Sequence, residues 1–176
     1  MEQKILTYIS LITGNLSNIN NDFLKQSIMI GQKRMSDDLK HTRYEDFYLP
    51  ESKEFKKIVE GIVYEYFKKF DKRLELLNYW AHVHNKFEST NTHHHFDTKD
   101  FEKSPEISGV YYVSTPKDCG KIVFIIPHNK YIEDRYEIEP KEGDYILFPS
   151  HLEHYVTKNL SDEKRISISF NMRTKK

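Results

Sequence analysis

The hydrophobic pattern of this chain changes its period once, and that change constrains the fold more than any other feature. From residue 55 to residue 70, apolar side chains recur at alternating spacings of three and one, which is the pattern of an amphipathic helix. After Asp71 the apolar runs become short and alternate with polar residues, as in strands that bury one face. The sequence therefore predicts helices first and a β-structure after them.

Two helices are predicted in the first part of the chain. One spans residues 54–70, with Pro50 and Ser52 before it as turn and cap signals. The other spans residues 22–34, after a stretch in which Gly14 and several asparagines break the pattern. Lysines and glutamates occupy the side of the 54–70 helix opposite its apolar face, so we expect it to pack on one side only.

Seven strands are predicted in the second part, separated by turn residues. They span residues 77–87, 107–115, 120–126, 135–139, 144–149, 154–158 and 165–172. Short strands at this density, preceded by helices, predict a mainly β fold of the jelly-roll type with helices supporting one sheet. A chain of 176 residues fits one domain, in which residues 1–73 form a helical support and residues 74–176 the jelly-roll core.

Composition narrows the classes of partner and compartment. Basic and acidic residues number 27 each, so the chain lacks the net positive charge that supports sequence-independent binding of nucleic acid. The single cysteine, Cys119, excludes an internal disulfide and favours a reducing, cytoplasmic setting. No apolar run approaches the length of a membrane span. We expect a monomer or homodimer that binds neither membrane nor nucleic acid.

Histidines and an aspartate have the spacing of a metal site. Residues two apart in an extended segment point the same way, so His95 and Asp97 can present an imidazole and a carboxylate to one point. His154, from a distant strand, would supply a third ligand. Two histidines and one carboxylate on one face of a metal leave three adjacent positions open, as in non-haem Fe(II) oxygenases.

A polar strand face near the C-terminus supplies a candidate anion clamp. In the run RISISFN the isoleucines and Phe170 form one face, and Arg165 and Ser167 lie together on the other. A guanidinium and a hydroxyl suit a carboxylate, because the arginine gives two parallel N–H bonds and the serine one O–H bond. A dicarboxylate that chelates a metal at one end needs such a clamp at its other end.

Together, these motifs resemble the pattern of the Fe(II)/2-oxoglutarate-dependent oxygenases. Over about residues 80–172, the runs SGVYYV, GKIVF and EGDYILFPSHLEHYV look like a short group of such oxygenases from phages and bacteria. The resemblance implies a cupin-like double-stranded β-helix, with Fe(II) at His95, Asp97 and His154 and 2-oxoglutarate at Arg165 and Ser167. It implies a dioxygenase that consumes O₂, hydroxylates an unidentified substrate, a small molecule or a protein side chain, and releases succinate and CO₂.

Several alternatives within the site stay open. In the short group the first histidine motif is HxH, which corresponds here to His93 and His95, so His93 is the alternative ligand to Asp97. One of Tyr111 and Tyr112 is expected to face into the barrel, where it either contacts the co-substrate or fills the core. We take Tyr112 as the candidate contact.

The other histidines are predicted to be structural or solvated. His82 and His84 share a strand face with Trp80, and we expect them to fill the barrel. His94 points away from its neighbours and is expected to be exposed, and His151 is expected to be solvated on a turn.

Two other function classes share parts of this pattern. A cupin-like metal-dependent isomerase or dioxygenase without 2-oxoglutarate would not need Arg165, and a non-catalytic jelly-roll binding module would need neither the metal nor Arg165. The polar insertion over residues 98–105 next to the metal motif is a candidate substrate lid.

Overall fold

The computed structural model describes residues 9–38, 46–47, 52–96, 100, 102, 104–129 and 132–175. The elements, in chain order, are β1 (Ile12–Asn15), α1 (Asn21–Asp38), β2 (Asp46–Phe47), α2 (Lys53–Phe70), β3 (Leu74–His84), β4 (Thr90–His93), β5 (Ile107–Ser114), β6 (Ile122–Asn129), β7 (Ile132–Ile138), β8 (Asp144–Pro149), β9 (His154–Val156) and β10 (Arg165–Thr174).

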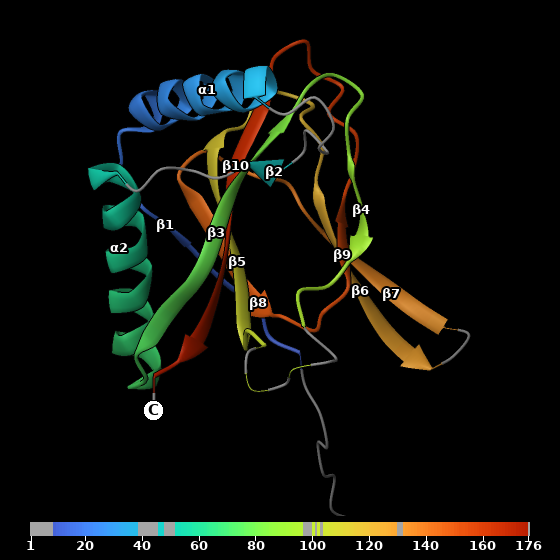
Figure 1. Ribbon diagram of the computed structural model, residues 1–176. Coiled ribbons are helices and arrows are strands. Elements are labelled where there is room, and N and C mark those ends of the chain that lie inside the picture. Colours follow the sequence, from blue (N-terminus) through green and yellow to red (C-terminus); the bar gives the residue numbers. More distant parts are fainter. Residues whose placement is uncertain are drawn as a thin grey trace, which may run out of the picture.

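The strands form two antiparallel sheets that face each other (Figure 1). The main sheet has the order β1-β8-β5-β10-β3-β2, and the small sheet has the order β4-β9-β6-β7. Apart from the consecutive pairs β2–β3 and β6–β7, neighbouring strands are distant in sequence, as when β10 pairs with both β3 and β5. This is the mainly β, two-sheet arrangement that the sequence predicts.

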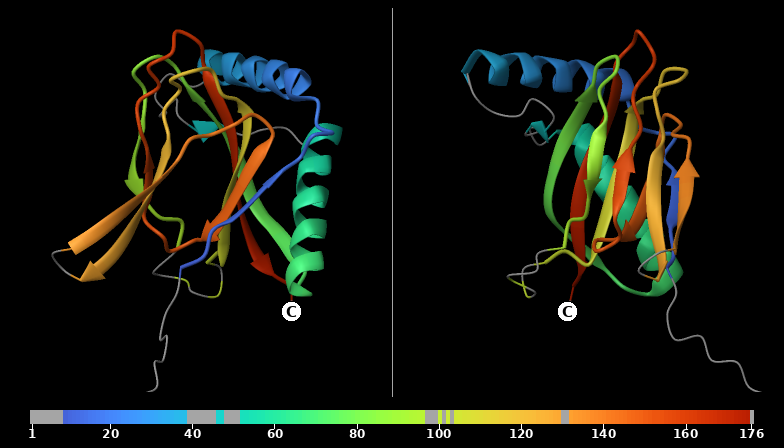
Figure 2. Two further views of the ribbon diagram at one scale, coloured as in Figure 1. Left: turned by 180° about the vertical axis from the view of Figure 1, so that it is seen from behind. Right: turned by 90° about the vertical axis from the view of Figure 1, so that its right-hand side faces the viewer.

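Both helices cover the face of the main sheet that points away from the small sheet (Figure 2). Ser52 caps α2 as predicted, because its hydroxyl accepts a hydrogen bond of 3.1 Å from the backbone N–H of Phe55. The apolar stripe of α2 supplies Phe55, Ile58 and Ile62 to the outer core. Other members of that core are the alternate residues of β10 and parts of α1, β5 and β8: Leu24, Ile28, Tyr111, Val113, Tyr145, Leu147, Ile166, Ile168, Phe170 and Met172.

A second, smaller core fills the space between the two sheets. It is made of Val110, Tyr112, Ile122, Phe124, Ile146, Phe148 and Leu152. Because side chains alternate along a strand, the residues of β10 that do not face the helices face this interior. The inner face of β10 therefore carries Arg165, Ser167 and Asn171, all of them buried.

The predicted helices and strands are all confirmed, with shifted ends. The helix predicted over residues 54–70 is α2, and the one over 22–34 is α1, which extends to Asp38. The seven predicted strands correspond to β3 and to β5 through β10. The sequence did not indicate β1, β2 or the short strand β4.

The N-terminal part contributes more than helices, since β1 forms an edge of the main sheet beside β8. The predicted organisation as one domain, with a helical support and a jelly-roll core, stays a prediction. Within the described residues, neither helix is sufficiently long and apolar to cross a membrane.

Replacing Gly109 by alanine is expected to destabilise the protein by about 2 kcal/mol, because a methyl group there has no room. A Cβ at this position would overlap the ring of Phe170 and lie 2.8 Å from Leu147 Cδ2. Thermal unfolding of the variant measures the loss. An unchanged melting temperature would contradict the tight packing of β5 on β10.

Gly61→Ala is the matched control, because it adds the same methyl group to α2. A Cβ there meets only the end of the flexible Leu16 side chain, at 3.0 Å. Since alanine favours the helix over glycine by about 1 kcal/mol, the control should unfold at or slightly above the wild-type temperature.

Candidate active site

Three histidines from two chain segments meet on the inner side of the small sheet. His93, at the end of β4, pairs in register with His154 of β9. The backbone N–H of His95 donates to the carbonyl of Ser150 at 2.8 Å, which holds this residue beside β9. One ring nitrogen of each of the three imidazoles lies within 4.8 Å of those of the other two. This set is the one cluster of potential metal ligands found among the described residues.

In two of these rings, hydrogen bonds engage Nδ1 and leave Nε2 available to a metal. The Nδ1 atom of His93 lies 2.8 Å from the carbonyl oxygen of Asn91, and that of His154 lies 2.9 Å from the carbonyl oxygen of Leu152. A carbonyl can only accept, so both Nδ1 atoms carry the proton and both Nε2 atoms carry a lone pair. Metal-binding histidines are commonly fixed in this way.

The spacing of the nitrogens fits a shared metal ion. His95 Nε2 and His154 Nε2 are 3.3 Å apart. Two imidazoles that bind one metal at right angles, with bonds of about 2.1 Å, place their nitrogens about 3.0 Å apart. Imidazole is also a suitable ligand for iron.

The charge state of His154 suits the same role. Burial lowers the pKa of His154 to about 4, against the opposing effect of its hydrogen bond to Leu152, and nearby His93 lowers it further. The imidazole is therefore neutral at pH 7, as a metal ligand must be.

Aromatic rings enclose the cluster. The indole of Trp80 stacks on His95 with ring centroids 5.4 Å apart, and the ring of Phe148 lies edge-on to His154 at 4.7 Å. Phe124 approaches His154 from the adjacent strand, at 6.0 Å. These rings keep water away from one side of the site, which strengthens electrostatic interactions within it.

A buried arginine lies on the inner face of the main sheet. Arg165 is 1% exposed, and no carboxylate of the described residues pairs with it. Its guanidinium lies over the ring of Tyr112, 5.4 Å from the centroid. Because a buried charge is costly unless it is paired, this guanidinium calls for an anionic ligand.

Two polar atoms beside this arginine are ready to bind such a ligand. The Nε of Arg165 and the hydroxyl of Tyr112 are buried, and no group of the described residues meets strict hydrogen-bond geometry with either atom, although the guanidinium lies close enough to the hydroxyl to act on its pKa. Burial raises the pKa of Tyr112 to about 12, although the charge of Arg165 opposes the rise, so the hydroxyl keeps its proton and can donate. Ser167 is buried on the same face of β10, and it pairs in register with Tyr112. A carboxylate fits this donor set.

The pairing of β10 with β3 relates the arginine to the histidine cluster. Arg165 lies opposite His84, and Ser169 lies opposite Trp80, the residue that stacks on His95. The backbone of Trp80 is therefore four residues along this strand pair from that of Arg165, or roughly 13 Å at 3.3 Å per residue, and the histidine cluster lies beside the Trp80 ring.

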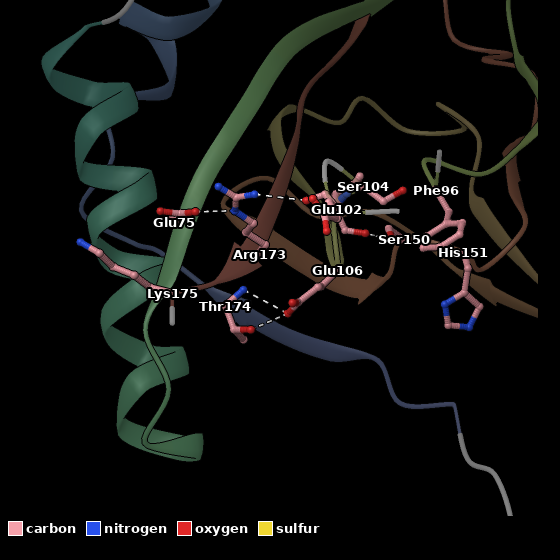
Figure 3. A pocket seen from close by; sticks show the side chains of 11 residues that line it. Glu75, Phe96, Glu102, Ser104, Glu106, Ser150, His151, Arg173, Thr174 and Lys175 are labelled. Atoms are coloured by element: carbon pink, nitrogen blue, oxygen red, sulfur yellow. Dashed lines mark hydrogen bonds and ion pairs between the residues drawn. The ribbon is translucent and has the colours of Figure 1, made fainter. Parts of the chain in front are cut away.

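A cavity of about 770 Å³ opens at the other end of β10 (Figure 3). Its lining residues are Glu75, Phe96, Glu102, Ser104, Pro105, Glu106, Ser150, His151, Arg173, Thr174 and Lys175. Arg173, four residues beyond Ser169, forms an ion pair with Glu75 on one side, and Phe96 and His151 lie on the other. Phe96 directly follows His95, so the cavity reaches the neighbourhood of the histidine cluster from the side opposite Arg165.

Two of the three carboxylates that line this cavity have partners, Glu75 in Arg173 and Glu106 in Thr174. Glu106 accepts from the hydroxyl and the backbone N–H of Thr174, at 2.6 and 3.1 Å. The hydroxyl bond is the main cause that lowers the pKa of Glu106. The predicted lid over residues 98–105 lies partly outside the described residues, but Glu102, Ser104 and Pro105 line the cavity.

The structure brings together some of the predicted site residues and does not describe Asp97. It brings His95 and His154 together with the alternative ligand His93, whereas Asp97 lies outside the described residues. Of the two tyrosines, Tyr112 faces the interior between the sheets, and Tyr111 faces the helices, where its hydroxyl donates to Asn21 at 2.9 Å. His94 and His151 are exposed, as predicted.

His82 and His84, predicted to fill the barrel, contact residues of the candidate site directly. Trp80 donates from Nε1 to His82 Nε2 at 2.7 Å, and Arg165 donates from Nη1 to His84 Nδ1 at 3.4 Å. The sequence signal was the shared parity of Trp80, His82 and His84. The sequence could not show that β3 pairs with β10, and this pairing is what places the shared face of the three residues beside Arg165.

Comparison with known proteins gives a consistent result. A family described as "Putative 2OG-Fe(II) oxygenase" matches residues 78–171, more than half of the chain. No curated protein matches the sequence. Two similar solved structures are a prolyl-4-hydroxylase from Pseudomonas putida and a viral collagen prolyl hydroxylase from Paramecium bursaria Chlorella virus-1 in complex with 2OG.

The likeness to these structures extends over nearly the whole chain. The bacterial enzyme is 13% identical, with 94% of this chain and 88% of that chain covered and a TM-score of 0.58. The viral enzyme is 18% identical, with 97% and 98% covered and a TM-score of 0.63. The epimerase SnoN from nogalamycin biosynthesis is 14% identical, with 92% and 76% covered and a TM-score of 0.66. At such identities the likeness shows the fold, and it confirms the predicted double-stranded β-helix.

Proposed function

Because this chain belongs to the family of 2OG-Fe(II) oxygenases, enzymes that use Fe(II) and 2-oxoglutarate, we propose that it hydroxylates a substrate that enters through the cavity near Arg173. One observation carries the proposal. Three imidazoles converge at a level of the barrel that lies between a buried arginine and an open cavity. A metal there can be reached by a co-substrate from one side and by a substrate from the other.

His93, His95 and His154 would hold the iron in this proposal. Their ring nitrogens already converge, and the Nδ1–H bonds of His93 and His154 leave Nε2 free to bind. Three ligands on one face leave the opposite positions open. Asp97 as a ligand stays a prediction, since it lies outside the described residues.

Arg165, Tyr112 and Ser167 would hold the far carboxylate of 2-oxoglutarate. The guanidinium supplies charge and directed N–H groups, the tyrosine supplies a buried, protonated hydroxyl beside it, and the serine is buried on the same face of β10 as the arginine. The ligand would in turn neutralise the buried charge of Arg165.

Iron held by the three histidines and 2-oxoglutarate held by Arg165 would supply the chemistry when bound, which is oxidative decarboxylation of the keto acid with O₂ to succinate and CO₂, coupled to hydroxylation of a C–H bond of the substrate. The residues of this chain set positions and exclude water. Trp80 and Phe148 shield the histidines, and the cavity beside Phe96 admits the substrate. Family membership supports this proposal over the two other function classes, the isomerase without 2-oxoglutarate and the non-catalytic module.

Titration of the anaerobic Fe(II)-loaded protein with 2-oxoglutarate tests this function. We expect a visible charge-transfer band that saturates at one equivalent of keto acid, and release of succinate once O₂ is admitted. Zinc-loaded protein is the control, because Zn²⁺ has a filled d shell and gives no such band. Bound iron without a band on adding 2-oxoglutarate would overturn the proposal.

A further inference from the structure

The guanidinium of Arg165 is held by a histidine, a partner that is unusual for a charged group. Its Nη1 lies 3.4 Å from Nδ1 of His84, the residue directly opposite it on β3. Both side chains are buried, at 1% and 2% exposure. Because two buried cations would repel each other, His84 must be neutral when it accepts a hydrogen bond from the charged Arg165.

That protonation state follows from the partners of His84. Arginine can only donate, so Nδ1 of His84 must accept and carries no proton. The proton of the neutral ring is therefore on Nε2, which lies 2.9 Å from the hydroxyl oxygen of Thr90 and donates to it. The two bonds fix the ring as the neutral Nε2–H tautomer.

The surroundings of His84 also fix its position. The side chain of Asn159 donates to the backbone carbonyl of His84 at 3.0 Å. Thr90 is the first residue of β4, the strand that ends at His93. One short strand thus supports both the imidazole beside the arginine and a proposed metal ligand.

We propose that His84 is a positioning residue, which turns the guanidinium of Arg165 so that one defined edge faces the co-substrate. This inference rests on the proposed binding of 2-oxoglutarate by Arg165. Nη1 is engaged by His84, whereas Nε has no partner among the described residues. A carboxylate can bind two parallel N–H groups on the Nε/Nη2 edge of a guanidinium. His84 leaves that edge open.

The gain is preorganisation. A long arginine side chain loses rotamer freedom when it binds a ligand, and a partner that fixes the side chain beforehand removes that cost from binding. His84 does this without neutralising the charge, since a carboxylate in its place would compete with the co-substrate. The affinity for 2-oxoglutarate should therefore depend on the acceptor at Nδ1 and not merely on the bulk of the ring.

A pair of variants of nearly equal shape isolates that acceptor. In His84→Asn the amide oxygen can occupy the place of Nδ1, whereas His84→Leu has the same branching and no acceptor; both lose the bond to Thr90. We expect His84→Leu to bind 2-oxoglutarate about tenfold more weakly than the wild type, and His84→Asn to stay within about threefold. Anaerobic calorimetry on the Fe(II)-loaded protein measures both values. Equal affinities of the two variants would overturn the inference.

Two further readouts separate positioning from a structural role. In succinate release measured without added substrate, the KM for 2-oxoglutarate should rise in His84→Leu while kcat at saturating 2-oxoglutarate is unchanged. Binding of 2-oxobutyrate, a keto acid without a far carboxylate, should be the same in the wild type and both variants. A general loss of structure would weaken both keto acids, and that result would also contradict the inference.

The Arg165→Ala variant distinguishes failure of this inference from failure of the proposed function. If Arg165→Ala binds 2-oxoglutarate as tightly as the wild type, the proposed clamp itself is wrong. If Arg165→Ala weakens binding and His84→Leu does not, only the positioning role is wrong. If His84→Leu does not fold, Thr90→Val and Thr90→Ser test the positioning role of His84 instead. Only valine removes the hydroxyl that binds Nε2 of the His84 ring. Weaker binding is then expected for valine alone, and equal binding by the two would overturn the role.

Discussion

Arg165→Ala is expected to lower the affinity for 2-oxoglutarate about 100-fold while iron still binds. Arg165 is buried on the inner face of β10, and no carboxylate of the described residues neutralises it. Loss of one partner from a buried, hydrogen-bonded charge pair costs about 3 kcal/mol, which corresponds to this change in affinity. The charge-transfer band of the anaerobic Fe(II) protein, followed against 2-oxoglutarate concentration, measures it.

Arg135→Ala is the matched control for this experiment. Arg135 lies exposed on β7, forms an ion pair with Glu133 on the same strand, and also contacts the side chain of Tyr155 on the surface of the small sheet. Its loss removes the same charge from the surface and should leave the affinity unchanged. If the two alanine variants bind 2-oxoglutarate alike, the far carboxylate is bound elsewhere.

His93→Ala and His154→Ala are each expected to reduce bound Fe(II) from about one equivalent to a small fraction. Each removes one of three converging imidazoles, and two ligands do not define a facial site. Metal analysis of the purified proteins measures the loss. The melting temperature supplies a second measure, since a metal that binds only the folded state raises it in the wild type and not in the variants.

The single tryptophan provides an optical check on the same variants. Trp80 stacks on His95, so a paramagnetic ion in the cluster should quench its fluorescence. Quenching by Fe(II) or Co(II) should saturate at one equivalent in the wild type and be absent in His93→Ala.

His94→Ala and Asp97→Asn complete the set. His94 is exposed between two proposed ligands, so its replacement should leave iron binding intact. Asp97→Asn separates the two ligand sets, because it should retain iron if His93 is the third ligand and lose iron if Asp97 is. Iron retained by His93→Ala and lost by Asp97→Asn would replace the three-histidine site by the pattern of two histidines and a carboxylate.

Local signals in the sequence were sufficient for α2 and for most strands, because their patterns repeat within a few residues. The strand β4, with the sequence TNTH, contains no apolar residue and owes its form to pairing with β9. Gly14 looked like a break in the pattern, yet it lies in β1, where a Cβ would overlap the ring of Tyr145. The partner of β1 lies more than a hundred residues away in the sequence, and the partner of β4 lies about sixty residues away. A periodic pattern within a few residues cannot indicate such pairing.

The same limit applies to the site. Strand parity placed Arg165 and Ser167 on one face, and the spacing of the histidines singled out His95 and His154. The sequence could not decide between Tyr111 and Tyr112, because the two faces of β5 are both buried and differ only in which core they enter. It also could not show that His84 meets Arg165, since that contact depends on the register of β3 against β10.

The sequence by itself determined the types of the elements, the residues that share a strand face and the chemical kinds of ligand at hand. These properties depend on neighbours within a few positions along the chain. The tertiary structure decided which faces meet: that His93 joins the histidine cluster, that a cavity opens beyond Phe96, and that an imidazole turns the buried guanidinium. Such contacts are fixed by strand order and register between distant segments, and a shift of one residue would turn each side chain to the opposite face.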